Sequence, residues 1–346
     1  MWLTAAGGAL VLSAAVSYAL SRYRGRRAIL DPINGRSLHV VPVPRMGGTG
    51  ILLGIVLAAG LVLVQGTGDA PLLSLALITI SFLLVVAVSL LDDVRGVGVI
   101  ARLAGHLSAA ALVVAAGLIL NRVSIGHDWV SLGVVAGSVV AVLLIVWLTN
   151  LYNFMDGMDG LAAGMGVFGF GAFAGLGLLA GNNGFALFNA GIAASCCGFL
   201  LSNFPPAKIF MGDTGSASLG FLAAVMMLWA NHQGLFPVWI GILVFSPFIV
   251  DATWTLARRV LRGRKPWQAH REHFYQRLVL GGWSQRKVLG GEYVLMAICA
   301  LFAIALESSD TVAVRCALLG ALTALYLGLI RLMNLLEAGC NGRRAA

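Results

Sequence analysis

The chain is a succession of apolar segments, each about as long as the hydrocarbon core of a bilayer is thick. A helix needs roughly 17–25 apolar residues to cross that core, and the sequence holds about eleven such segments. Only 11% of the residues are charged, against about 25% in soluble domains. We therefore expect an all-α, polytopic integral membrane protein with a single domain, residues 1–346. The predicted spans are 2–21, 47–65, 72–91, 103–120, 130–149, 161–179, 185–202, 215–230, 236–257, 290–306 and 312–332.

Lys and Arg residues are distributed unequally between the two sides of the predicted bundle. Of the 23 basic residues, only Arg122 and Arg315 fall in loops on the side of the N-terminus. Because cytoplasmic loops are enriched in Lys and Arg, we expect an external N-terminus and a cytoplasmic C-terminus. No basic region precedes the first span, which favours a retained helix over a cleaved signal peptide. The net charge of +9 fits loops beside anionic lipid and not a nucleic-acid-binding domain.

Two predicted cytoplasmic loops, residues 22–46 and 258–289, are longer than the others. Loops beyond about 12–15 residues are often functional. Imidazolium and guanidinium groups donate hydrogen bonds to oxyanions, so both loops are candidates for phosphate binding. Each could equally be an ordinary basic loop at the membrane surface. The side chains in question are Arg36, His39, Arg45, His270, Arg271 and His273.

Adjacent carboxylates, Asp92 and Asp93, end the third predicted span. Carboxylates at a membrane edge are costly unless they are solvated, paired or bound to a metal. Taken alone, this pair fits a solvated helix end as well as it fits a functional site.

The run NLYNFMDGMDGL places Asn150, Asn153, Asp156 and Asp159 at steps of three residues. If the segment is helical, these four side chains form a hydrogen-bonding strip on one face. Asp213, in MGDTGS at the start of the eighth span, adds another acid. Oxygen ligands without Cys favour Mg2+, or Mn2+, over zinc. Since Mg2+ usually takes only one or two carboxylates, we expect the other acids to bind substrate hydroxyls or to act as a base.

The segment GGTGILLG, residues 47–54, loosely resembles a phosphate-binding loop. It lacks the preceding strand and the full spacing of such loops, so it carries little weight.

In this order, the motifs resemble those of the polyprenyl-phosphate N-acetylhexosamine-1-phosphate transferase superfamily, glycosyltransferase family 4. The superfamily includes the bacterial enzymes that initiate O-antigen synthesis and the muramyl-pentapeptide phosphotransferase of peptidoglycan synthesis. The resemblance extends from residue 31 to about residue 278. Its pieces are DPINGRSLHVVPVPRMGG, LLDD, NLYNFMDGMDGL, NFPPAKIFMGDTGS and AHREH.

The resemblance implies transfer of an N-acetylhexosamine-1-phosphate from a UDP-sugar to undecaprenyl (polyprenyl) phosphate, with release of UMP, at the cytoplasmic face of a bacterial inner membrane. It implies catalytic roles for Asp92, Asp93, Asp156 and Asp159, and Mg2+ binding by Asp213 with Asp92. A homodimer is compatible with it. The substrate-binding residues that it implies are Asn150, Asn153, Arg102, Arg36, His39, Arg45, Asn203, Lys208, His270, His273 and Arg271.

Some positions depart from the patterns of relatives. The muramyl enzymes carry three consecutive histidines and Pro-Thr-Met-Gly-Gly where this chain has AHREH and PRMGG. This difference favours the O-antigen-initiating branch, with the muramyl type as an alternative. Several relatives have Lys where this chain has Arg102, and the two side chains are not interchangeable. An ion-coupled transporter is the alternative from another class, although such carriers place polar sites near the midplane. The sequence does not select among GlcNAc, GalNAc, FucNAc and QuiNAc as the sugar.

Overall fold

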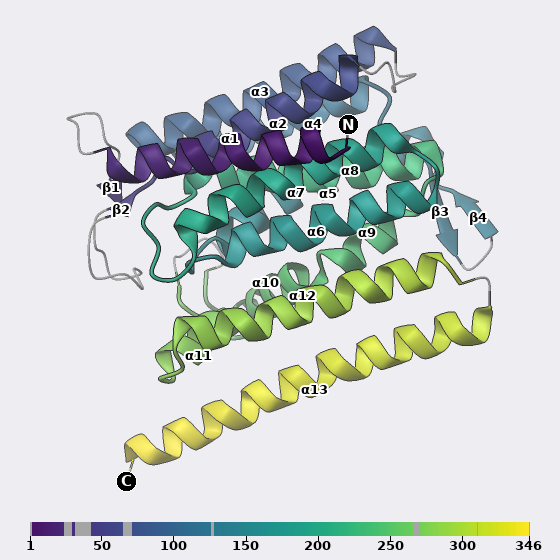
Figure 1. The fold of residues 1–346 in the computed structure, drawn as a ribbon. Coiled ribbons are helices and arrows are strands. Elements are labelled where there is room, and N and C mark those ends of the chain that lie inside the picture. The colour runs from purple at the N-terminus through teal and green to yellow at the C-terminus, as the bar shows by residue number, and fades with distance from the viewer. Residues whose placement is uncertain are drawn as a thin grey trace.

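The computed structural model describes residues 2–23, 30–31, 43–64, 71–125, 128–265, 270–309 and 311–345. They form a helical bundle with two small hairpins (Figure 1). The helices are α1 (Trp2–Arg22), α2 (Gly48–Val64), α3 (Leu72–Arg95), α4 (Val99–Ala115), α5 (Gly133–Met155), α6 (Leu161–Leu179), α7 (Asn183–Asn203), α8 (Gly212–Gln233), α9 (Val238–Val244), α10 (Ser246–Leu261), α11 (Phe274–Leu280), α12 (Gln285–Glu307) and α13 (Val312–Ala345). The strands are β1 (Leu30–Asp31), β2 (Val43–Pro44), β3 (Arg122–Ile125) and β4 (Asp128–Ser131).

Eight of the described helices are long and apolar enough to cross a membrane, namely α1, α3, α5, α6, α7, α8, α12 and α13. Helices α9 and α10 together would form a ninth crossing, and α2 and α4 are shorter apolar helices. Each predicted span therefore coincides with a helix or a helix pair, as expected for a multi-pass membrane protein. The count of eleven crossings and the orientation in the membrane stay predictions.

The predicted span 236–257 is wrong as a single straight helix. Helix α9 ends at Val244, α10 begins at Ser246, and the two are bent by 80°. Pro247 lies in the first turn of α10, where its missing N–H costs no helical hydrogen bond. The bend turns α10, with its Asp251, away from the direction of α9.

Helix α8 lies inside the bundle and is almost completely buried between α3 and α5. A Cβ added to Gly220 would overlap the carbonyl oxygen of Leu148 on α5. Small residues of this kind let membrane helices approach closely. The close packing fixes the first turn of α8 relative to the ends of α3 and α5, where the polar residues lie.

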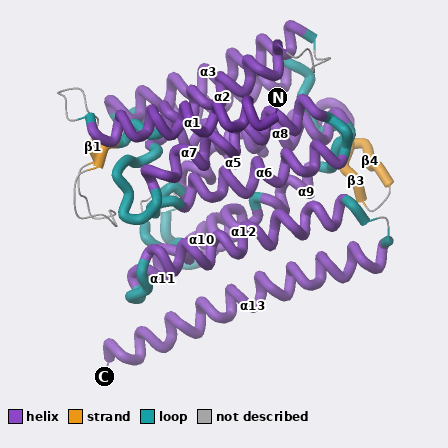
Figure 2. Tube along the Cα trace, viewed as in Figure 1, coloured by secondary structure: helices purple, strands orange, loops and turns teal. Residues whose placement is uncertain are grey.

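The two hairpins lie at opposite ends of the bundle, and α11 lies at the β1 end (Figure 2). The β3–β4 hairpin, in which Val123 is paired with Val130, is a feature that the all-α expectation omits. β-branched residues at paired positions favour strands. The short β1–β2 hairpin pairs Leu30 with Pro44.

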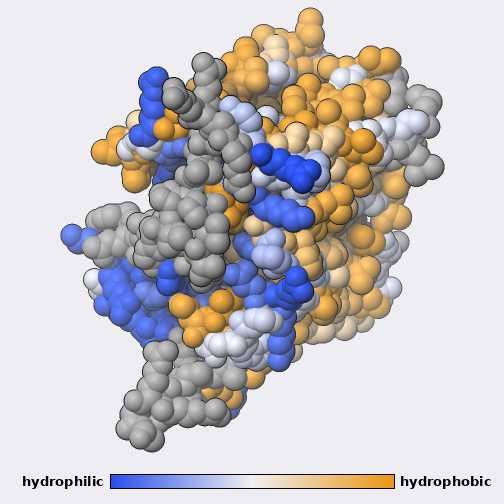
Figure 3. Space-filling view, turned by 60° about the vertical axis from the view of Figure 1, so that its left-hand side comes forward, coloured by the Kyte–Doolittle hydropathy of each residue, from blue (hydrophilic) through white to orange (hydrophobic). Residues whose placement is uncertain are grey.

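Hydrophilic residues gather at one end of the molecule, and hydrophobic residues cover most of the remaining surface in view (Figure 3). Many exposed side chains on the transmembrane helices are large and apolar, such as Leu83 on α3 and Leu143 on α5. A surface of this kind is expected where helices contact lipid. Helix α13 lies along α12 at the edge of the bundle (Figure 1).

Candidate active site

The Asp93 carboxylate binds the first turn of α8. It accepts hydrogen bonds from the backbone N–H groups of Asp213 and Thr214, both at 2.9 Å, and from the Thr214 hydroxyl at 2.7 Å. The first N–H groups of a helix have no intrahelical partner, and a carboxylate also interacts favourably with the helix dipole. Asp93 is buried, at 8% exposure. This geometry makes Asp93 a residue that positions α8, and it leaves the carboxylate little capacity for the predicted catalytic role.

Gly212, the first residue of α8, provides the backbone conformation that this contact needs. Its φ is +73°, a region in which residues with a Cβ are strained. A Cβ there would also lie 2.8 Å from the carbonyl oxygen of Arg45 and 2.9 Å from Asp93 Oδ2. Any larger residue would therefore push α3 and α8 apart.

The Arg45 guanidinium contacts the carboxylates of both Asp93 and Asp213. Its Nη2 atom lies 3.2 Å from Asp93 Oδ1 and 3.3 Å from Asp213 Oδ1. Arg45 of the first long loop thus contacts two members of an acidic cluster that consists of Asp92, Asp93 and Asp213, and its role in substrate binding stays a prediction.

The glycines after Arg45 serve the packing of backbone against backbone. Gly47 N donates to Phe210 O and Gly48 N donates to Met211 O, each at 2.8 Å. A Cβ added to Gly48 would overlap Gly215 in the first turn of α8. The GGTG segment therefore fits a close helix contact and does not support a phosphate-binding loop.

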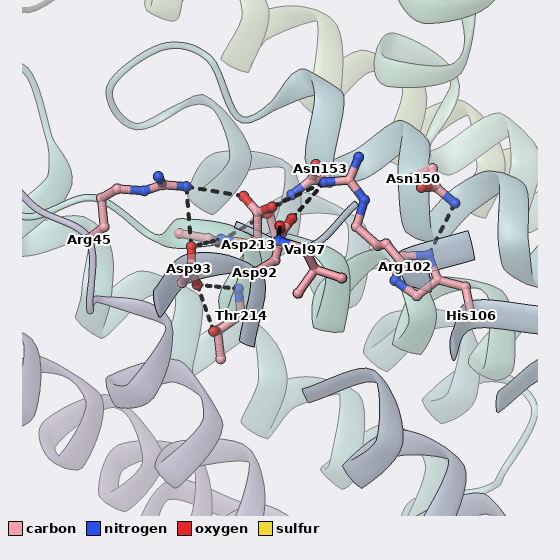
Figure 4. A network of polar contacts seen from close by, with 12 residues as sticks. Arg45, Asp92, Asp93, Val97, Arg102, His106, Asn150, Asn153, Asp213 and Thr214 are labelled. Atoms are coloured by element: carbon pink, nitrogen blue, oxygen red, sulfur yellow. Dashed lines mark hydrogen bonds and ion pairs between the residues drawn. The ribbon is translucent and has the colours of Figure 1, made fainter. Parts of the chain in front are cut away.

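A second group of ion pairs lies beside the contact between Asp93 and the first turn of α8 (Figure 4). It joins Asp92, Arg102 and Asp213. Arg102 Nη1 lies 2.7 Å from Asp92 Oδ2 and 3.5 Å from Asp213 Oδ2. Asp92 also accepts a hydrogen bond from the backbone N–H of Val97 at 2.6 Å. Unlike Asp93, the Asp92 and Asp213 side chains are only partly buried. These two carboxylates, from the end of α3 and the start of α8, are therefore available to a ligand.

The two asparagines of α5 have different partners. Asn153 Nδ2 donates to the Ser216 hydroxyl at 3.0 Å, and its side chain also contacts Asp213. Asn150 Nδ2 donates to Val146 O at 2.7 Å and lies 3.2 Å from His106 Nδ1. Asn153 therefore belongs to the acidic cluster, whereas Asn150 contacts α4.

The polar strip predicted on one helical face is not continuous, because α5 ends at Met155. The turn that follows ends at Gly160, whose left-handed φ of +75° would strain a residue with a Cβ, and α6 begins at Leu161. Asp156 follows α5 directly, and burial together with the charge of Asp213 raises its pKa to about 7. Asp159 instead accepts a hydrogen bond from Ala207 N at 2.9 Å. Asp156 therefore faces the acidic cluster, while Asp159 holds the loop before α8.

Asn203 also has a structural set of contacts. Its side chain accepts from Gly160 N at 2.9 Å and donates to Ile209 O at 2.8 Å. Lys208 is exposed and Arg271 is half-buried. The predicted substrate-binding residues Arg36 and His39 lie outside the described residues.

A residue that the sequence reasoning missed, Asp251, organises the histidine loop. Its two oxygens each lie 3.0 Å from Phe274 N, and Oδ1 lies 3.2 Å from His273 Nδ1. It is 4% exposed. The available signal was an acid inside an apolar segment, which is rarely accidental in a membrane protein.

The two histidines lie together, with ring centroids 4.9 Å apart. Burial, then the neighbouring His273, lowers the pKa of His270 to about 4. Glu272, which lies between the two histidines in the chain, forms ion pairs with Arg259 and Arg264. Burial alone would raise the Glu272 pKa, but the two guanidinium groups outweigh it and lower the pKa below its usual value.

The histidine loop reaches the acidic cluster through Tyr275. The His273 ring stacks on the Tyr275 ring at 5.8 Å, and a Cβ added to Gly157 would overlap the Tyr275 hydroxyl. Gly157 follows Asp156 in the turn after α5. The structure thus places α11 directly against the turn that carries Asp156.

The donor set suits a hard divalent cation that is shared with a substrate. Among the described residues, no group of three His, Cys, Asp or Glu side chains could hold a metal ion alone. Mg2+ does not require such a group, because it is usually bound by one or two carboxylates, water and substrate phosphates. Asp92 and Asp213 converge on one guanidinium nitrogen and offer carboxylate oxygen ligands of the kind that Mg2+ takes.

Comparisons with known proteins place the chain in a family. A model of glycosyl transferase family 4 matches residues 75–231. A probable undecaprenyl-phosphate N-acetylglucosaminyl 1-phosphate transferase of Bacillus subtilis is 32% identical over 81% of this chain and 78% of its own length. The decaprenyl-phosphate N-acetylglucosaminephosphotransferase of Mycobacterium tuberculosis is 31% identical over 88% of this chain and 81% of its own length.

A muramyl enzyme is similar to a comparable degree. The phospho-N-acetylmuramoyl-pentapeptide-transferase of Shouchella clausii is 32% identical over 75% of this chain and 82% of its own length. The matched family model covers the segment from α3 to α8, which contributes Asp92, Arg102, Asn153 and Asp213. On this identity and coverage, the chain belongs to glycosyl transferase family 4.

Proposed function

We propose that this protein transfers an N-acetylhexosamine-1-phosphate from a UDP-sugar to a polyprenyl phosphate such as undecaprenyl phosphate and releases UMP. The observation that carries the proposal is the convergence of Asp92 and Asp213 on Arg102 at the polar end of a membrane bundle. Both proposed substrates bring phosphate groups to such a site, and one of them is a lipid. Relatives with 31–32% identity are named for this class of reaction.

The reaction joins the two phosphates. An oxygen of the lipid phosphate attacks the β-phosphorus of the UDP-sugar, a new P–O bond forms, and the bond from that phosphorus to the oxygen bridging it to UMP breaks. Phosphoryl transfer depends mainly on positioning and on neutralising charge. Arg102 and Arg45, both partly exposed beside the acids, are placed to hold phosphate oxygens, and the histidine loop carries His270 and His273 to the same end.

Asp213 and Asp92 would hold Mg2+, or Mn2+ in its place. The bound cation would neutralise charge on the diphosphate. Asp156 lies directly after α5 beside these acids, where its carboxylate could exchange a proton with a substrate hydroxyl. Direct attack is our preferred route. If an aspartyl-phosphate forms instead, Asp92 is the better nucleophile, because its side chain is 10% exposed, against 2% for Asp93.

We also propose a membrane location and a biosynthetic pathway for this reaction. We place the enzyme in a bacterial inner membrane with its site facing the cytoplasm, because the basic loops lie on that side of the predicted topology. The sequence AHREH favours initiation of O-antigen or a related surface glycan. Peptidoglycan synthesis is the second candidate, since a muramyl transferase is 32% identical. A homodimer is part of the same proposal.

The test uses full-length protein in detergent with undecaprenyl phosphate, Mg2+ and a panel that includes UDP-GlcNAc, UDP-GalNAc and UDP-MurNAc-pentapeptide. We expect UMP release that requires the lipid and stops when EDTA removes Mg2+. Asp213→Asn and Asp92→Asn should abolish it. Asp128→Asn, on the hairpin at the opposite end of the bundle, is the matched control and should not. Folded wild-type protein that releases no UMP with any donor would contradict the proposal.

A further inference from the structure

His106 on α4 has an imidazole nitrogen without a partner in the protein interior. The residue is 2% exposed, and its Nε2 atom has no hydrogen-bond partner among the described residues. A buried donor or acceptor without a partner destabilises the folded protein. Such a group in a folded protein requires an explanation.

Asn150 determines which nitrogen of His106 carries the proton. The Asn150 Nδ2 atom donates to the carbonyl oxygen of Val146 at 2.7 Å, so the amide nitrogen must be the atom on that side. The same nitrogen lies 3.2 Å from His106 Nδ1. Since an amide nitrogen can only donate, His106 Nδ1 accepts, and the proton of the neutral ring lies on Nε2. The unsatisfied atom is therefore a donor.

His106 also lies next to the acidic cluster. It follows Arg102 by four residues on α4, so the two side chains share one face of the helix. Arg102 lies between the His106–Asn150 pair and the carboxylates of Asp92 and Asp213 (Figure 4). Leu103 and Leu107 lie about 100° around α4 from Arg102 and His106, and both are exposed and apolar, so a lipid substrate in the bilayer can approach this side of the helix.

We propose that the His106 Nε2–H group donates a hydrogen bond to a phosphate oxygen of a reacting substrate, while Asn150 holds the ring in the tautomer that can donate. Beside Arg102, a phosphate is the acceptor that both the cation and the N–H would recognise. The inference rests on the proposed function and assigns Asn150 an indirect role, because its amide nitrogen is already engaged. The phosphate belongs either to the lipid or to the UDP-sugar, and the test separates the two.

The experiment compares two substitutions that differ in the reach of the donor. In His106→Gln the side-chain amide nitrogen extends about as far as Nε2, whereas in His106→Asn it extends only about as far as Nδ1. We expect His106→Asn to raise the KM for one phosphate substrate by about 10- to 100-fold, the effect of losing one hydrogen bond to a charged group. His106→Gln should restore most of the difference. His232→Asn, at the far end of α8, is the matched control.

The substrate whose KM rises identifies the source of the phosphate. Equal KM values for His106→Asn and wild type, or an equal loss in both His106 variants, would overturn the inference, because either result fits a side chain that only packs α4 against α5. Thermal unfolding in detergent, measured alongside, establishes that each variant is folded.

A binding measurement keeps this inference separate from the proposed function. Farnesyl phosphate, a short lipid monophosphate, and UDP are titrated into each protein by calorimetry, which needs no turnover. Suppose that wild type shows no transfer, that His106→Asn binds one of these probes at least about tenfold more weakly than wild type, and that His106→Gln does not. The phosphate site is then supported, while the transferase proposal fails. If wild type is active and both variants bind both probes as wild type does, the site is refuted and the transferase proposal stands.

Discussion

Replacing Asp93 with Asn is expected to destabilise the protein, because Asp93 holds the first turn of α8. The carboxylate accepts four hydrogen bonds, two on each oxygen. Oδ1 binds Asp213 N and Arg45, and Oδ2 binds the backbone N–H and the hydroxyl of Thr214. The amide of Asn has only one oxygen, so its NH2 group must face two donors.

The magnitude follows from these contacts. Whichever oxygen is replaced, one buried backbone N–H at the start of α8 loses its acceptor, at a cost of about 1–3 kcal/mol. Loss of the negative charge at the helix N-terminus adds roughly 0.3–1 kcal/mol. We therefore expect a loss of about 1–4 kcal/mol in the free energy of unfolding. Asp92→Asn should cost roughly 1 kcal/mol or less, because its ion pair with Arg102 is partly exposed.

The assay is thermal unfolding in detergent at a fixed heating rate, followed with a thiol-reactive dye. Cys196, which is completely buried, becomes reactive when the bundle opens. Asp93→Asn should lower the apparent Tm by about 2–5 °C, with Asp92→Asn close to wild type but inactive. Equal Tm values for Asp93→Asn and wild type would refute the capping argument. So would an inactive Asp93→Asn protein of unchanged stability, which would restore the catalytic role.

Three further predictions concern other parts of the site. Gly212→Ala should destabilise the protein by about 1 kcal/mol or more. Gly171→Ala should not, because nothing lies within 4 Å of a Cβ added there. Similar Tm values for the two variants would contradict the argument from the backbone conformation of Gly212. Asp251→Ala should lower kcat about 10- to 100-fold with a smaller effect on KM, and an unchanged kcat would show that the histidine loop does not need this anchor. Because the pKa of Glu272 is lowered in the folded protein, its contribution to stability is present above its unfolded pKa and is lost as the pH falls below about 4. The Tm of wild type should therefore drop more steeply on acidification than that of Glu272→Gln, and parallel curves would contradict this assignment.

Hydropathy predicted the helices well, because a bilayer leaves the backbone no hydrogen-bond partners except its own. The predicted span 161–179 and helix α6 have the same limits. The same signal could not reveal the 80° bend before α10, since both halves of the broken span are apolar. The hint was Pro247, whose effect depends on what the packing around it tolerates.

The candidate acids could be found from the sequence, but their separate roles could not. Asp92 and Asp93 are neighbours in the chain, yet only Asp93 binds the α8 backbone, 120 residues away. Adjacent residues on a helix point in different directions, and which of them meets α8 is decided by tertiary packing. For the same reason the sequence placed Asp159 with Asp156, whereas the turn after Met155 directs it to Ala207.

The most direct test of the central claim uses a UDP-N-acetyl sugar with 32P in its β-phosphate, incubated with the protein, undecaprenyl phosphate and Mg2+. Transfer of a sugar-1-phosphate predicts that the label enters the lipid phase as a diphosphate-linked sugar, that unlabelled UMP appears in the aqueous phase, and that Asp213→Asn abolishes both. Label that stays in the aqueous phase as UDP while the sugar moves to lipid would mean that the sugar is transferred without its phosphate, and would contradict the account.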